Sequence, residues 1–173
     1  MRTKPIDGAA GVDRHRPYLY LAGPLFSHAE LVYNKKLKGK LNRYFDVYLP
    51  QEDGELLVEL IQKGMPSNAA AQRIYNNDIF AIRRADAVLI ILDGRGVDEG
   101  AAFEIGFAKA LGKPCFGLQT DPRRLLPIGN NPMIDCSLEQ IFLTERQLLR
   151  WAASYTRSGF SVNRLHIRPR TGT

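Results

Sequence analysis

The stretch that decides the fold runs from Ala87-Val-Leu-Ile-Ile-Leu92, through a turn, into Asp98-Glu-Gly-Ala-Ala-Phe-Glu-Ile-Gly106. Its first part is a short, unbroken apolar run rich in β-branched residues, which is typical of a strand covered on both faces of a sheet. Asp98 stands where the N-cap of a helix belongs, and Gly112-Lys-Pro114 supplies the glycine and proline that end it. The stretch therefore predicts a strand followed by a helix.

Other strands and helices alternate along the rest of the chain. The patterns predict strands at 18–22, 46–49 and 115–118, and a last strand at either 133–136 or 140–143. They predict helices at 28–45, 55–63, 67–84 with Ser67 as its cap, and 144–155 with Thr144 as its cap, while 51–54 is predicted to be a polar loop. Such alternation predicts an α/β fold with a parallel five-stranded sheet and helices on both faces.

The charge of the chain is concentrated at its two ends. The 173 residues carry a net charge of +6, and the excess lies in residues 1–16 and 157–173, so that the residues between them are neutral. We expect a basic leader at 1–16, a single catalytic α/β domain at 17–156 and a basic tail at 157–173. Because the globular part is neutral, the charge argues against a nucleic-acid-binding protein.

Several other classes are disfavoured by what the sequence lacks. No stretch approaches the length of a membrane span, and no charged-then-apolar leader is present, so we expect a cytoplasmic protein with no membrane association. Cys115 and Cys136 do not form a metal or disulfide pattern, and the three histidines are scattered, so we expect no metal. No dinucleotide-binding Gly-x-Gly-x-x-Gly and no phosphate-loop lysine follow the first strand.

Glu104 is the first candidate site residue. Side chains in a helix lean toward its N-terminus, so Glu104 reaches over Gly100 and Ala101, which leave room for a ligand. A glutamate among apolar neighbours costs free energy to desolvate unless it is paired. The alternative, equally compatible with this segment alone, is that Glu104 faces solvent and pairs with Lys109 or Lys113.

The ends of the predicted strands indicate where a ligand binds. In a parallel α/β sheet, ligands bind beyond the carboxyl ends of the strands. The first such end is Gly23-Pro-Leu-Phe-Ser27, where Pro24 has no N–H for a phosphate and the next two residues are apolar. This loop suits a flat, apolar-faced ligand, and the side chains that could supply its surface are Tyr20, Phe26, Tyr75 and Met133.

The run Tyr75-Asn-Asn-Asp78 interrupts the apolar stripe of the helix predicted at 67–84. Asn and Asp are poor helix formers in mid-helix, although Asn76 and Asn77 could simply face water. Asp78 is different, because Ile74 and Ile82 lie one turn to either side of it on the same face.

Taken together, these motifs resemble those of a nucleoside 2-deoxyribosyltransferase. The resemblance covers roughly residues 18–143 with order and spacing preserved. The matching pieces are Tyr20-Leu-Ala-Gly-Pro-Leu-Phe26, Tyr75-Asn-Asn-Asp78, Ala85-Asp86, Asp98-x-Gly100-x3-Glu104-x-Gly106, Gly112-Lys-Pro114 and Asn131-Pro-Met133.

The resemblance implies a flavodoxin-like, Rossmann-like subunit that exchanges the base of a 2′-deoxynucleoside for a free nucleobase, without a cofactor. It also implies a homo-oligomer with shared active sites. By position, Glu104 is the nucleophile, Tyr20 orients it, Asp78 serves the base and Asp98 serves the sugar. The remaining substrate-binding positions are Gly23, Phe26, Tyr75 and Gly100, together with Asn131 and Met133, which would reach the site of a neighbouring subunit.

By analogy with glycosidases, two carboxyls about 5 Å apart favour double displacement with retention of configuration. We therefore predict a covalent deoxyribosyl-Glu104 intermediate. The main alternative is an N-glycoside hydrolase of (deoxy)nucleoside 5′-monophosphates, and a more distant one is a non-catalytic nucleotide-sensing module. The sequence leaves open whether pyrimidines as well as purines are exchanged, and whether a 2′-hydroxyl is tolerated.

Overall fold

The computed structural model describes residues 16–123 and 129–157. The predicted leader and tail fall almost entirely outside these ranges. Within them, no helix combines the length and the apolar character that crossing a membrane requires.

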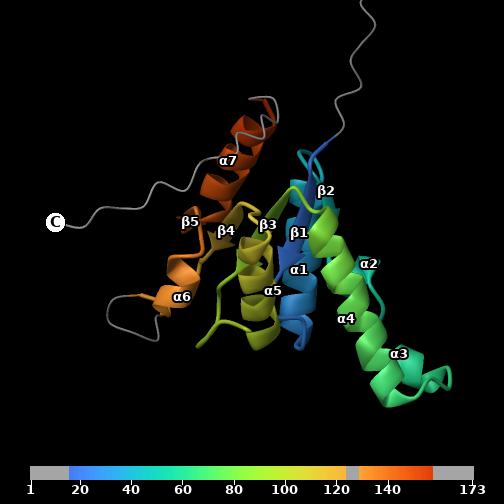
Figure 1. Ribbon diagram of the computed structural model, residues 1–173. Coiled ribbons are helices and arrows are strands. Elements are labelled where there is room, and N and C mark those ends of the chain that lie inside the picture. The colour runs from blue at the N-terminus through green and yellow to red at the C-terminus, as the bar shows by residue number, and fades with distance from the viewer. Residues whose placement is uncertain (1–15, 124–128, 158–173) are drawn as a thin grey trace, which may run out of the picture.

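Five parallel strands form the sheet at the centre of the molecule (Figure 1). They are β1 (Tyr18–Ala22), β2 (Asp46–Tyr48), β3 (Ala87–Ile91), β4 (Cys115–Leu118) and β5 (Gln140–Phe142), in the spatial order β2-β1-β3-β4-β5. The register places Tyr20 of β1 between Tyr48 of β2 and Val88 of β3. This confirms the predicted α/β, flavodoxin-like sheet and decides the last strand in favour of 140–143.

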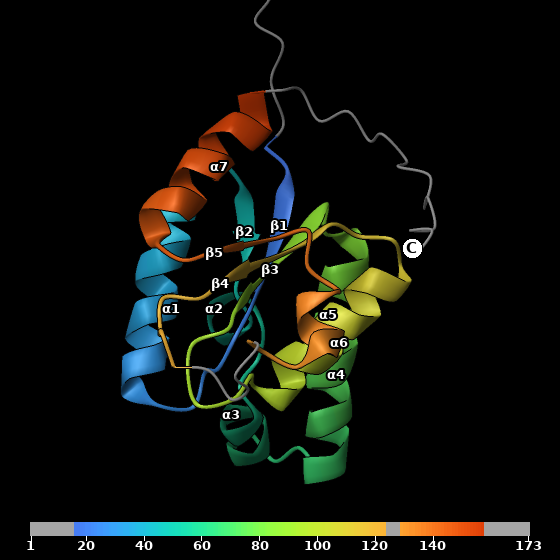
Figure 2. The ribbon, with the colours of Figure 1, turned by 90° about the vertical axis from the view of Figure 1, so that its left-hand side faces the viewer.

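Helices cover both faces of the sheet, as Figure 2 shows. Helix α1 and helix α7 lie on one face, and α4 and α5 lie on the other. The helices are α1 (His28–Leu41), α2 (Pro50–Asp53), α3 (Leu57–Gln62), α4 (Ser67–Arg84), α5 (Glu99–Ala110), α6 (Pro132–Asp135) and α7 (Glu145–Arg157).

The strands direct alternate residues into two hydrophobic cores. Along β1, Leu19 and Leu21 belong to the core under α1 and α7, whereas Tyr20 and Ala22 belong to the core under α4 and α5. This follows from the two-residue period of a strand. The fully buried ring of Tyr20 therefore faces the same side of the sheet as the helix that carries Glu104.

Several predicted boundaries and elements differ from the structure. Helix α1 ends at Leu41, because the chain turns at Asn42 and brings Phe45 into the core against Trp151. The predicted loop at 51–54 is largely helix α2, with Pro50 as its first residue, a position where the missing N–H costs nothing. For the same reason Pro132 starts α6, which occupies one of the two places that the sequence offers for the last strand. Ser67 is already helical, and Pro66 is the N-cap of α4.

The predicted caps of two other helices were confirmed. The Asp98 side chain accepts a hydrogen bond from the backbone N–H of Ala101 at the start of α5. The Thr144 hydroxyl accepts one from the N–H of Gln147 at the start of α7. Gly112, just beyond α5, adopts φ +71°, a left-handed conformation that favours glycine.

Candidate active site

Glu104 and Tyr20 form the central pair of the candidate site. Tyr20 comes from β1 and Glu104 from the second turn of α5, and the Tyr20 hydroxyl donates to Glu104 Oε1 over 2.5 Å. The alternative that Glu104 pairs with a lysine in solvent was wrong, because both lysines are engaged elsewhere. Lys109 pairs with Glu139, and Lys113 donates to the backbone carbonyls of Arg83 and Ala85.

A second phenol and carboxylate lie beside the first pair. Tyr48, the last residue of β2, donates through its hydroxyl to Asp78 Oδ1 over 3.3 Å. The rings of Tyr48 and Tyr20 are stacked, with their centroids 5.4 Å apart and their planes 20° from parallel. Because neighbouring strands hold the two rings in register, the sheet fixes both hydroxyls, one for each carboxylate.

Burial changes the acidity of both carboxyls. Desolvation raises the pKa of Glu104 to about 8, although the hydrogen bond from Tyr20 lowers it, and the charges of Asp78 and Asp98 raise it further. Desolvation also raises the pKa of Asp78 to about 6, against the hydrogen bond from Tyr48. The pKa of Tyr20 is raised by burial and by Glu104, so its hydroxyl remains a donor. The two carboxyls therefore differ in acidity, and Glu104 holds its proton more firmly than Asp78 does.

Asp98 and Gly100 lie at the start of α5, before the turn that carries Glu104. One oxygen of Asp98 caps the helix through the N–H of Ala101, over 2.8 Å. A Cβ at position 100 would lie 3.2 Å from the same oxygen, so a glycine there relieves crowding around the cap. The structure therefore gives both residues a structural role, and the binding roles expected from the resemblance stay predictions.

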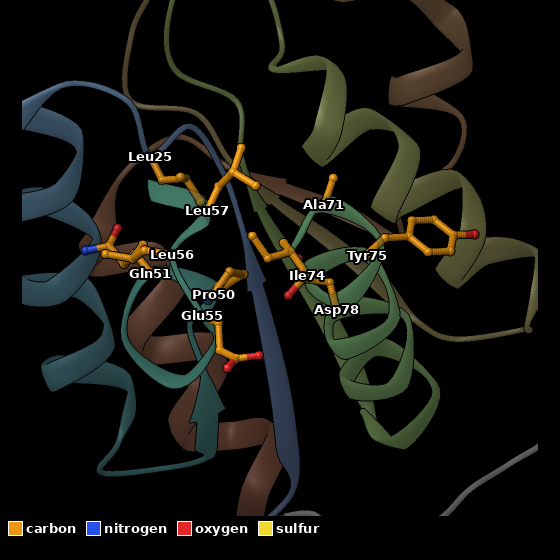
Figure 3. A pocket seen from close by; sticks show the side chains of 10 residues that line it. All are labelled: Leu25, Pro50, Gln51, Glu55, Leu56, Leu57, Ala71, Ile74, Tyr75 and Asp78. Carbon is orange, nitrogen blue, oxygen red and sulfur yellow. The ribbon is translucent and has the colours of Figure 1, made fainter. Parts of the chain in front are cut away.

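A cavity of about 380 Å³ lies beside Asp78, between the α2–α3 segment and α4 (Figure 3). Most of its lining is apolar, and Gln51, Glu55, Tyr75 and Asp78 add polar groups. The apolar lining residues are Leu25, Pro50, Leu56, Leu57, Ala71 and Ile74. A mostly apolar cavity with a few polar groups is typical of a site for a small organic ligand.

Buried polar contacts hold the wall of this cavity in place. The Asn34 side chain, which is buried, donates to the backbone carbonyl of Pro24 and to Gln51 Oε1, each over 2.9 Å. Gln51 in turn donates to the carbonyl of Leu31. These bonds tie α1, the loop after β1 and α2 together, so the positions of Leu25 and Pro50 are fixed relative to each other.

Not every predicted site residue lies at this cavity. Tyr75 lines it, but Phe26 and Met133 do not, and their side chains are 80% and 78% exposed. Asn131 caps α6 by accepting a bond from the N–H of Met133. Gly23 allows β1 and β3 to approach closely, because a Cβ there would lie 3.1 Å from the side chain of Ile91. Contacts of these residues with substrate or with a neighbouring subunit stay predictions.

Sequence reasoning missed three residues of the site. Tyr48 contacts Asp78, Glu55 lines the cavity, and Asn34 supports its wall. Only Tyr48 had a partial signal, since it is next to last in the strand predicted at 46–49, close to the edge where ligands bind. Within the described part of the chain, no group of three or more His, Cys, Asp and Glu residues could hold a metal ion.

Comparisons with known proteins identify a matching family. The family model described as nucleoside 2-deoxyribosyltransferase matches residues 19–163. A search among curated protein sequences found no significant match.

The solved structures that match this chain include two that are at least 25% identical to it. A conserved protein from Enterococcus faecalis V583 is 27% identical, with a TM-score of 0.69 over 80% of this chain and 98% of its own. A 2-deoxyribosyltransferase from the psychrotolerant bacterium Bacillus psychrosaccharolyticus is 25% identical, with a TM-score of 0.63 over 76% of this chain and 90% of its own. The chain thus belongs to the nucleoside 2-deoxyribosyltransferase family, which points to an enzyme that acts on nucleosides by N-glycosyl transfer or hydrolysis.

Proposed function

We propose that the protein transfers 2-deoxyribose between nucleobases, by double displacement with retention of configuration through a covalent deoxyribosyl-Glu104 intermediate. The observation that carries this proposal is the 2.5 Å hydrogen bond from Tyr20 to Glu104, which fixes a desolvated carboxyl group in the second turn of α5. Asp78, the second carboxyl with a raised pKa, lies close enough for its charge to raise the pKa of Glu104. It also lines the cavity that would hold the base.

In the first displacement, a carboxylate oxygen of Glu104 attacks C1′ while the bond from C1′ to the base nitrogen breaks. The departing base takes the electron pair of that bond and a proton from Asp78, which must therefore be protonated when the reaction begins. Tyr20 keeps its hydrogen bond to Glu104, so the attacking group is oriented in the ground state and in the transition state.

In the second displacement, a nitrogen of the incoming base attacks C1′ on the face opposite to Glu104. The ester bond between C1′ and Glu104 breaks, and the carboxylate recovers its electron pair. Asp78, now ionised, takes the proton that the incoming base loses. Two inversions at C1′ give net retention, so a β-nucleoside yields a β-nucleoside.

The character of the cavity favours transfer over the alternative hydrolysis of 5′-monophosphates. No lysine or arginine is among the described residues that line it, whereas a phosphate group calls for cationic or N–H donors. Apolar side chains from Leu25, Leu56 and Ile74 form a surface suited to a planar base. A base that occupies this surface excludes water from C1′, and the intermediate then reacts with the base rather than with water.

The test is chromatography of the protein incubated with deoxyinosine plus adenine, and separately with thymidine plus adenine. Formation of deoxyadenosine in either mixture supports the transferase, and formation in both shows that pyrimidines are accepted as well as purines. Free deoxyribose without deoxyadenosine would contradict the proposal and favour a hydrolase. Absence of both products would also contradict it, and 5′-monophosphates would then be tried.

We also propose that the protein is a homo-oligomer whose active sites are shared between subunits. The exposed positions of Asn131 and Met133 on and beside α6 support this, since neither side chain is used in the core of its own subunit. Sedimentation velocity measures the assembly directly, and a monomer at catalytic concentrations would contradict this part of the proposal.

A further inference from the structure

The cavity beside Asp78 has a second carboxylate, Glu55, on its other wall. Figure 3 shows Glu55 on the side formed by Pro50, Gln51 and Leu56, and Asp78 on the side formed by α4. In the proposed reaction Asp78 exchanges a proton with the base. Glu55 has no part in that step, and its side chain, which is 29% exposed, is paired with Arg73.

Two donors from α4 hold one oxygen of Glu55. Arg73 Nε donates to Glu55 Oε2 over 2.5 Å, and Asn77 Nδ2 donates to the same oxygen over 2.9 Å. The hydrogen bond from Arg73 lowers the pKa of Glu55, so this carboxylate is ionised at neutral pH. Among the described residues, none donates a hydrogen bond to the other oxygen, Oε1.

The other polar groups of the lining are less available to a ligand. The amide of Gln51 accepts from Asn34 and donates to the carbonyl of Leu31, so both of its ends are already bonded to the protein. The ring of Tyr75 points away from the Glu55 side of the cavity in Figure 3. Glu55 Oε1 therefore differs from these groups, because it belongs to a residue that lines the cavity and it accepts no hydrogen bond from another described residue.

We infer that Glu55 selects nucleobases that present an exocyclic amino group, such as adenine, over bases with an oxo group at that position, such as hypoxanthine. The inference rests on the proposed function, because it assigns the cavity to the base. An ionised carboxylate only accepts hydrogen bonds, so it pairs with an amino group and repels a carbonyl oxygen. A site built to pair with a substrate N–H discriminates against the analogue that lacks it, because its own polar group is then left unpaired.

The anchoring of Glu55 makes the variant Glu55→Gln informative. Arg73 and Asn77 are both donors, so the glutamine oxygen will face them and its NH₂ will face the cavity. The variant thus replaces the acceptor by a donor at one position, without a change in side-chain length. An amide donor pairs with the carbonyl of hypoxanthine, so the preference will shift toward the oxo base.

The experiment places adenine and hypoxanthine in competition for one donor, deoxyguanosine, and measures the ratio of deoxyadenosine to deoxyinosine formed. For the wild type we expect a preference for adenine of about tenfold or more, the size of effect given by one hydrogen bond to a charged group. In Glu55→Gln the ratio will fall by about tenfold or more. Glu59→Gln is the matched control, since Glu59 is exposed on α3 and does not line the cavity, and its ratio will equal that of the wild type.

An unchanged ratio in folded Glu55→Gln would overturn the inference while leaving the transferase intact. If this variant does not fold, the wild type with N6,N6-dimethyladenine decides, because that base lacks both amino hydrogens and must react as poorly as hypoxanthine. If the wild type transfers no base at all, the proposed function fails. Calorimetric binding of adenine and hypoxanthine to the wild type then tests the inference separately, and equal affinities would overturn it.

Discussion

The two pairs of tyrosine and carboxyl groups, Tyr20 with Glu104 and Tyr48 with Asp78, are the smallest units on which the proposed chemistry depends. In each pair a neutral phenol donates to a carboxyl whose pKa is raised by burial. Burial has removed each carboxyl from water, and the hydrogen bond from the phenol replaces part of that hydration and fixes the orientation of the carboxyl.

The variant Tyr20→Phe removes the hydroxyl and keeps the ring in the core. Because the hydrogen bond from Tyr20 lowers the pKa of Glu104, that pKa will rise further, and the fraction of ionised Glu104 at neutral pH will fall. We expect kcat to drop by roughly 10- to 100-fold, the effect of one hydrogen bond to a charged group, with the melting temperature little changed. Steady-state kinetics at several pH values measures this. Tyr18→Phe, two residues earlier on β1, is the control, and an equal loss there would contradict the role of Tyr20.

The pH dependence of kcat/KM follows from the two carboxyls. The proposed reaction needs Glu104 ionised and Asp78 protonated, while their pKa values are about 8 and about 6. The active form is therefore a minor one, and its population rises as pH approaches 6, is level between the two values and falls above 8. In Asp78→Asn we expect a much lower rate without the alkaline fall. An alkaline fall that persists in this variant would exclude Asp78 as the acid.

The raised pKa of Glu104 also makes the stability of the folded protein depend on pH. The ordinary pKa of glutamate is 4.5, so between that value and about 8 the folded protein holds a proton that the unfolded chain releases. Stability contributed by this proton is complete at low pH and is lost as pH rises through that window. Glu104→Gln lacks the titration and still accepts from Tyr20, so at pH 8 it will be more stable than the wild type by roughly 1–3 kcal/mol. Urea unfolding at pH 5 and pH 8 tests this, and equal differences at the two pH values would contradict it.

Helix α5 carries the proposed nucleophile, Glu104, and its stability depends in part on its N-cap, Asp98. Asp98→Ala will destabilise the protein by about 1 kcal/mol, the usual effect of losing an N-cap. Asp98→Asn keeps the cap and will melt like the wild type. If Asp98 also binds the sugar, as the resemblance implies, Asp98→Asn will raise KM for the nucleoside even though its stability is normal. An Asp98→Asn variant with wild-type kinetics would leave Asp98 with its structural role alone.

The strands and long helices could be predicted from sequence because their patterns are local. β3 is a continuous apolar run, and α5 carries both its cap and its glycine stop. The short helices α2 and α6 could not be predicted in this way, since Pro50 and Pro132 are compatible with a loop as well as with the first residue of a helix. The last strand stayed ambiguous because 133–136 and 140–143 have similar compositions, and only the space beside β4 decides between them.

At the scale of the whole molecule, the strand order places the site. β1 lies between β2 and β3, so residues that are far apart in the chain, such as Tyr20, Tyr48 and the helices that flank β3, meet on one face of the sheet. Glu104, Tyr20 and Asp78 could be predicted because they stand in motifs of the family. The contact of Tyr48 with Asp78 and the place of Glu55 at the cavity could not be predicted, because they depend on the register of β2 and on the path of the chain between α2 and α3.

The most direct test of the proposed function is the intact mass of the protein after rapid mixing with deoxyinosine and acid quenching. We expect a species heavier by one deoxyribosyl group in the wild type and its absence in Glu104→Ala. Proteolysis of the adduct will place the added mass on the peptide that contains Glu104. Turnover of deoxyinosine without any adduct, or an adduct that persists in Glu104→Ala, would contradict a covalent intermediate on this residue.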